Sequence, residues 1–249
     1  MMKKILLLLL IFSSLFGNAQ IDFAKQIKKK DFDEITFKSI TNTNGDVIHG
    51  FFMDNLAVGP YMLKRADGTL EYKNYNRKHQ IDGSMITFNQ LDATVTLENY
   101  RKGVPEGGAF QLKNGNIVWA KTFKNGTSIE DNLGMYREKK ANAANCIGDC
   151  LNGFGIKKNT KINSITIGFF AFESVKYPAL ATYSDNGQYF GQFILGIREQ
   201  FGVYVFPSGR KYIGFWKKGD QEGYGFYLDK EGQVEEKGYY KNGSLAMSM

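Results

Sequence analysis

The stretch Tyr212-Ile-Gly-Phe-Trp-Lys-Lys-Gly219, followed by Glu222-Gly-Tyr-Gly-Phe-Tyr227, decides the fold. Tyr212, Gly214 and Trp216 are two residues apart, so they would share one face of a β-strand. The glycine-rich, charged segment that follows them is typical of a turn, and a second aromatic strand comes after it. The stretch therefore predicts a β-hairpin with an aromatic face.

The same pattern recurs along the chain. Residues Tyr189, Gly191, Phe193 and Gly202 lie 23 residues before Tyr212, Gly214, Trp216 and Gly225, and only Gly223 has no glycine counterpart. One position of the unit falls at Phe52, Tyr75, Tyr100, Phe123, Cys146, Phe170, Phe193, Trp216 and Tyr240, at steps of 23 to 25 residues. A fixed period of this length indicates a repeat architecture of about nine hairpins, with a defective copy between 170 and 186 that lacks the loop glycines.

Glycine inside a strand usually weakens it and often marks the close approach of another group. Here glycine alternates with rings on one face, so we expect a ring from the neighbouring unit to lie over the bare backbone. Glycines at the turns are expected to supply positive φ angles. A single hairpin is marginal in water, so the units are expected to stack into one ladder.

These residues resemble the MORN repeat. The resemblance is close over Tyr212–Tyr227 and Tyr189–Gly209, and the segment Cys150–Gly155 resembles the start of a MORN array. The earlier half is similar to a looser MORN variant of bacterial proteins, with motifs such as Tyr100-Arg-Lys-Gly103. The resemblance implies an elongated, twisted antiparallel sheet, and a role in protein–protein contacts, dimerisation or phospholipid binding.

Composition agrees with an all-β fold of short strands and tight turns, because the chain has 28 Gly, 4 Pro and 14% aromatic residues. We predict an elongated antiparallel sheet of about nine stacked hairpins. The predicted organisation is a signal peptide at 1–19, an N-terminal cap at 20–45, looser repeats at 46–128, a linker or loop at 129–145 and closer repeats at 146–245.

The first residues set the predicted localisation. Lys3 and Lys4 precede an apolar run from Ile5 to Phe12, and small residues then precede Gln20. This is the pattern of a secretory signal peptide, and the apolar run is shorter than the ~20 residues that span a bilayer. We expect the protein to be exported and to remain in the periplasm or cell envelope, or to be secreted.

Cys146 and Cys150 are the two cysteines of the chain. An even number in an exported protein favours a disulfide, here across the turn of one hairpin. The alternative is a metal pair, which would need two more ligands from His49 or His79, several units away.

No enzyme motif is recognised. His49 and His79, the two histidines, lie in no nucleophile or metal motif, and Gly153-Phe-Gly155 is no phosphate loop. We predict no catalytic, cofactor or metal site. A nucleic acid partner is not expected for an exported chain. A hydrolase with an unrecognised cleft is a further alternative.

The expected function is a non-catalytic scaffold that binds a protein partner, which could be a second copy. A candidate contact surface comprises Phe190, Phe206, Arg210, Lys211, Lys217 and Lys218, and the phenylalanines could instead complete the core. The alternative function is a module that binds glycan or anionic lipid through its tyrosines and cations.

Overall fold

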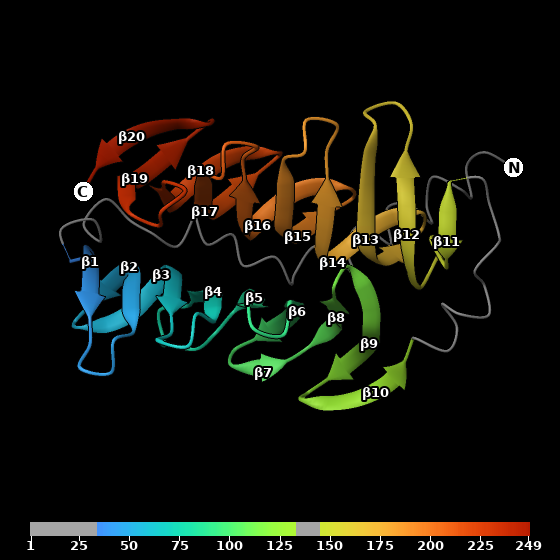
Figure 1. The fold of residues 1–249 in the computed structure, drawn as a ribbon, viewed down its shortest axis with the longest axis horizontal. Helices are drawn as coiled ribbons and strands as arrows, with labels where there is room; N and C mark the ends of the chain where they lie inside the picture. Colours follow the sequence, from blue (N-terminus) through green and yellow to red (C-terminus); the bar gives the residue numbers. More distant parts are fainter. Residues whose placement is uncertain (1–33, 133–144) are drawn as a thin grey trace, which may run out of the picture. The chain divides into compact units, whose positions relative to one another are not determined.

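The computed structural model describes residues 34–132 and 145–249. Within these ranges the chain is all-β, without a helix, and its 20 strands form two antiparallel sheets (Figure 1). The predicted signal peptide (1–19), residues 20–33 of the predicted cap and residues 133–144 of the predicted linker lie outside the described residues.

The first sheet contains the strands from residues 36 to 131. They are β1 (Thr36–Thr41), β2 (Val47–Met53), β3 (Leu56–Lys64), β4 (Leu70–Tyr75), β5 (Gly83–Asn89), β6 (Thr94–Arg101), β7 (Val104–Pro105), β8 (Gly107–Lys113), β9 (Asn116–Lys124) and β10 (Thr127–Asp131). β1 therefore begins inside the segment that the sequence assigned to a cap, and β10 ends inside the predicted linker.

The second sheet contains the strands from residues 146 to 248. They are β11 (Cys146–Gly148), β12 (Phe154–Asn159), β13 (Ser164–Ala171), β14 (Ser174–Thr182), β15 (Gln188–Ile194), β16 (Ile197–Val205), β17 (Lys211–Lys217), β18 (Asp220–Leu228), β19 (Val234–Lys241) and β20 (Ser244–Ser248). In both sheets each strand pairs with its neighbours in the sequence, except that β7 and β8 both pair with β6.

The predicted fold class, all-β with stacked antiparallel hairpins, is confirmed. The hairpins are divided between two sheets, and the division falls between β10 and β11, where a linker was predicted. The physical reason is that both sheets have an apolar face to bury, and packing one sheet against the other buries both faces.

The tips of the tight hairpins have the expected left-handed backbone. In the β17–β18 turn Lys218 has φ 53° and Gly219 has φ 91°, and in the β19–β20 turn Asn242 and Gly243 have φ 48° and 79°. Two consecutive positive φ angles define the type I′ turn, whose twist matches that of paired strands. The glycines of these turns are therefore explained by backbone conformation.

Ring contacts join the two sheets across a shared core. The ring centroids of Phe88 and Phe190 are 5.0 Å apart, and those of Phe110 and Phe154 are 5.3 Å apart. At another point along the interface the side chain of Gln192 donates a hydrogen bond to the Oδ1 of Asn99. Residues 34–249 form one compact unit through contacts of this kind.

Candidate interaction surfaces

The predicted repeat residues form a row across the second sheet. Gly191, Gly202, Gly214, Gly225 and Gly238 are direct cross-strand partners from β15 to β19. Side chains are absent along this line because rings occupy the space above it. The glycine row therefore has a structural role.

Tyrosine rings cover the row. A Cβ added to Gly202 would collide with the hydroxyl group and ring of Tyr189, and one added to Gly225 would collide with Tyr212. From the sequence, the ring was expected to come from the neighbouring unit. This expectation is wrong, because Tyr189 and Gly202 belong to the same hairpin, β15–β16.

The aromatic face of the second sheet is largely closed. Tyr189, Tyr212 and Trp216 are buried, and the ring centroids of Tyr212 and Trp216 are 5.2 Å apart. Arg198 places its guanidinium 4.5 Å from the Trp216 ring centroid and 5.3 Å from that of Tyr204. Cation–π attraction therefore holds the Arg198 side chain of the same sheet over these rings.

Gly223 of the predicted repeat and Phe193 also have structural roles. Gly223 has φ 91° and a neighbouring ring, Phe215, within 3.4 Å of the position of its absent Cβ. Phe193 is buried and packs edge-on against Tyr189, with ring centroids 5.0 Å apart.

The six residues of the predicted contact surface do not lie together. Phe190 is only 3% exposed and packs between the sheets, so it belongs to the core, as the alternative had it, and not to a contact surface. Phe206 is partly buried against Tyr204, with ring centroids 4.7 Å apart. A local hairpin pattern does not predict the sheet-to-sheet packing that buries Phe190.

The four cations of the predicted contact surface also lie in different surroundings. Arg210 stacks 3.8 Å from the ring centroid of Tyr227 and pairs with Glu235, so its charge is already engaged. Lys211 is half-buried and lines a pocket between the sheets. Lys217 and Lys218 are exposed at the β17–β18 tip.

A different surface emerges at the hairpin tips of the second sheet. Phe172 is 76% exposed at the β13–β14 tip, and Leu195 is 78% exposed at the β15–β16 tip. Leu151 and Ile197, beside these two tips, are 53% and 47% exposed. We name Leu151, Phe172, Leu195 and Ile197 the tip ridge.

The backbone of the tip ridge is unfavourable for its side chains. Phe172 and Glu173 have φ angles of 50° and 63°, although neither is glycine or asparagine. A bulky residue with positive φ is a conformational outlier, and such outliers gather at functional sites. The sequence signal was the missing turn glycine of the defective repeat, which placed Phe172 in a turn.

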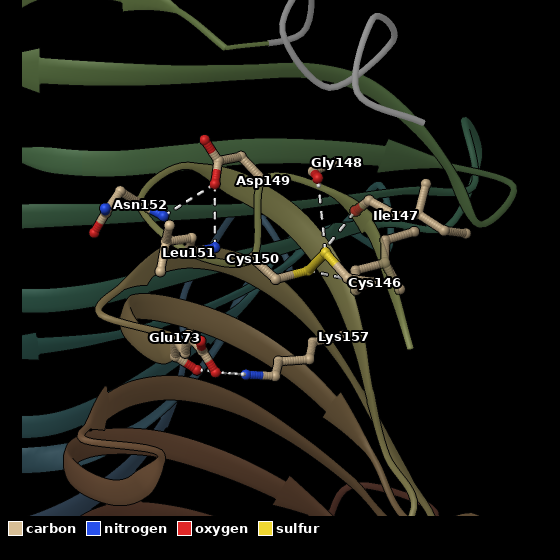
Figure 2. Close-up of a disulfide and its surroundings, with 10 residues drawn as sticks. Cys146, Ile147, Gly148, Asp149, Cys150, Leu151, Asn152, Lys157 and Glu173 are labelled. Carbon is tan, nitrogen blue, oxygen red and sulfur yellow. Dashed lines mark hydrogen bonds and ion pairs between the residues drawn. A yellow bond between two sulfur atoms is a disulfide. The ribbon is translucent and has the colours of Figure 1, made fainter. Parts of the chain in front are cut away.

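Neighbouring segments hold this strained tip in place. The backbone N–H of Phe172 donates to Oδ1 of Asn152 at 3.1 Å, and that of Glu173 donates to the Leu151 carbonyl oxygen at 3.1 Å. Lys157 donates to the Glu173 carbonyl oxygen at 2.7 Å, and Figure 2 shows its ammonium group directed at Glu173.

The disulfide predicted between Cys146 and Cys150 is present, with Cα atoms 6.1 Å apart (Figure 2). Inside its loop the Asp149 carboxylate accepts hydrogen bonds from the N–H groups of Leu151 and Asn152, at 3.1 and 3.0 Å. The disulfide thus ends directly before Leu151 and Asn152, which hold the Phe172 tip.

Both histidines have structural partners. The Nδ1 atom of His49 lies 2.9 Å from the Ser39 hydroxyl, and Nδ1 of His79 lies 2.9 Å from the Ala57 carbonyl oxygen. Burial lowers the pKa of His49, and a hydrogen bond with the Gly232 backbone opposes this shift. Across the described ranges, no group of three or more His, Cys, Asp or Glu residues is arranged to hold a metal ion.

The first sheet carries a charged cluster beside the rings of Tyr61 and Tyr75. Glu71 accepts hydrogen bonds from Arg65 at 2.5 Å and from Lys73 at 2.7 Å. Burial alone would raise the pKa of Glu71, but these two cations hold it below its usual range. Burial, aided by Tyr75 and Glu71, raises the pKa of the nearby Tyr61 to about 12.

No protein-family model matches the chain, and no curated protein matches it. Among residues 34–132 and 145–249, no helix is long and apolar enough to cross a membrane.

Proposed function

We propose that this chain is a non-catalytic repeat scaffold of the MORN type that binds a protein partner through the tip ridge, in the cell envelope or extracellular space. The single observation that carries the proposal is the exposure of Phe172 and Leu195 on left-handed backbone, a costly arrangement with no packing role in the described fold. Exposed apolar clusters of this kind mark interaction sites.

The flat faces of the sheets are weaker candidates. The face that carries Phe190 and Phe226 is buried against the other sheet. The opposite face of the second sheet is closed by its own tyrosines and Arg198. The hairpin tips therefore remain as the apolar surface available to a partner.

A protein partner is favoured over an anionic membrane by the charges at the same tips. Glu173, next to Phe172, has a side chain that is 72% exposed, and Glu199 accepts the Lys218 N–H at the neighbouring tip. Insertion of the ridge into an anionic bilayer would bring these carboxylates to the headgroups, which repel them. Export is supported by the disulfide, because such bonds persist in oxidising compartments.

Site-specific photo-crosslinking in the native envelope and culture medium tests the proposal. A photoreactive phenylalanine analogue at position 172 or 195 should give a discrete protein adduct. The same analogue at Asn114, a tip of the first sheet, should give none. Flotation with anionic vesicles covers the rival outcome, and lipid binding that depends on Phe172 without a protein adduct would contradict the proposal.

A further inference from the structure

A second candidate site lies between the two sheets and includes no residue of the tip ridge. It is a pocket of about 430 Å³, within the size range of small-molecule sites. One wall comes from β1 to β4 of the first sheet, and the other from β17, β18 and the β18–β19 turn of the second. It exists only because the sheets pack face to face, so a single-hairpin pattern does not reveal it.

The inner part of the pocket is apolar. Met62, Tyr72 and Leu228 are almost fully buried where they line it, and Ile40 and Val47 extend this lining along β1 and β2. Such a lining would take up a hydrocarbon group and exclude water from it. This part of the pocket would therefore hold the apolar part of a ligand.

The rest of the lining is cationic. Lys64, Lys211 and Lys230 contribute three positive charges, and Glu231 contributes one negative charge, which pairs with Lys230 at 3.5 Å. The side chain of Lys64 makes no hydrogen bond or ion pair with the described part of the chain. The pocket thus retains an excess of positive charge beside its apolar wall.

Lys211 is the cation best placed for a ligand. Its ammonium group is half-buried and its hydrogen bond to the Gly209 carbonyl oxygen is long, at 3.3 Å. Burial lowers the pKa of Lys211, and the Asp229 carboxylate opposes this shift. An anion that entered the pocket would replace the hydration that burial removes from this ammonium group.

His49 also lines the pocket. Its Nδ1 atom lies 2.9 Å from the Ser39 hydroxyl of the first sheet, and the Gly232 backbone of the second sheet opposes the lowering of its pKa. Ser39 and Gly232 both line the pocket, so the histidine lies between the two sheets at this point.

We infer that this pocket binds a small amphipathic anion, with a carboxylate on Lys211 and Lys64 and a hydrocarbon group against Met62, Tyr72 and Leu228. The inference is independent of the proposed scaffold function, because it uses none of the tip-ridge residues. A half-buried salt bridge would hold the carboxylate of the ligand, and the apolar wall would select its hydrocarbon group.

Calorimetric titration of the full mature chain with decanoate, below its micellar concentration, tests the inference. Decanoate should bind with one-to-one stoichiometry, and decanol and inorganic phosphate should each bind at least roughly tenfold more weakly. Lys211→Gln should weaken decanoate binding roughly tenfold, which corresponds to about 1.4 kcal/mol and to the loss of one charge-assisted contact. Lys217→Gln, on the same strand but at the exposed tip, should leave it unchanged.

A second measurement does not depend on the variants folding. Reductive methylation followed by mass spectrometry should show that decanoate protects Lys211 and Lys64, while Lys217 and Lys218 react at an unaltered rate. Absence of decanoate binding, equal binding of decanol or of phosphate, or equal protection of all four lysines would each overturn the inference.

Discussion

The hydroxyl of Tyr212 donates a hydrogen bond to the carbonyl oxygen of Phe215, 3.3 Å away on the same strand. The ladder between β17 and β18 shifts register between Gly214 and Trp216, so Phe215 lies in a β-bulge. Tyr189 makes the equivalent contact with the Gln192 carbonyl oxygen at 3.1 Å, beside the register shift of β15. The repeat tyrosine thus donates a hydrogen bond to a carbonyl oxygen at the bulge of its own strand.

Removal of this hydroxyl should destabilise the fold. Tyr212→Phe removes the hydroxyl that donates to the Phe215 carbonyl oxygen, and we expect a loss of about 1–2 kcal/mol in the free energy of unfolding. Tyr204→Phe is the control, because the Tyr204 hydroxyl makes no hydrogen bond with the described residues, and it should cost less than about 0.5 kcal/mol. Urea denaturation would measure both, and equal losses would contradict the assignment.

The contact between ring and glycine predicts coupling between two positions. Gly202→Ala should cost about 1–3 kcal/mol, because its methyl group collides with the Tyr189 ring. In a Tyr189→Leu background the same change should cost much less, since a leucine side chain ends short of Gly202. A double-mutant cycle measures this coupling, and strictly additive costs would show that the ring does not explain the glycine.

The tip ridge predicts opposite effects on stability and binding. Phe172→Asn relieves the left-handed strain, because asparagine tolerates positive φ, and should raise stability by about 0.5–1 kcal/mol. The same variant should lose the protein partner. The reciprocal variant Lys218→Phe, at φ 53° on a neighbouring tip, should lower stability. A Phe172→Asn protein that is less stable and still binds its partner would refute a functional role for the ridge.

Protonation of His49 should weaken the fold in acid. Burial depresses its folded-state pKa below the ordinary value of 6.5, so the neutral ring stabilises the fold above pH 6.5. This contribution is lost as the pH falls from about 6.5 through the folded-state pKa. The melting temperature of His49→Asn should therefore fall less steeply than that of the wild type over this range. Parallel pH profiles would exclude His49 as the source.

Local chemistry made much of the fold predictable. The alternation of Tyr212, Gly214 and Trp216 predicted the strands, and the turn glycines predicted the positive φ angles. Register within a hairpin follows from a two-residue turn, so the spacing alone is informative. The disulfide between Cys146 and Cys150 was predictable for the same reason, because it closes within one local segment.

The parts that were missed depend on contacts distant in sequence. Phe88 and Phe190 are about a hundred residues apart, and nothing in either hairpin specifies that the two rings meet. Phe190 was therefore a candidate for both a contact surface and the core, and it lies in the core, while the pocket beside Lys211 was not anticipated. The tip ridge was visible only as a departure from the repeat, since Phe172 occupies a turn without glycine.

The two sheets pack face to face, which buries Phe190 and leaves the tips exposed. Asn99 and Gln192, on opposite sheets and hydrogen-bonded to each other, provide the most direct test. After Asn99→Cys and Gln192→Cys substitution, mild oxidation followed by peptide mapping should find an intramolecular 99–192 disulfide beside the native one. A chain with Asn99→Cys and Lys217→Cys should form no such link. Failure of the 99–192 pair to form, in a folded monomer, would contradict the account.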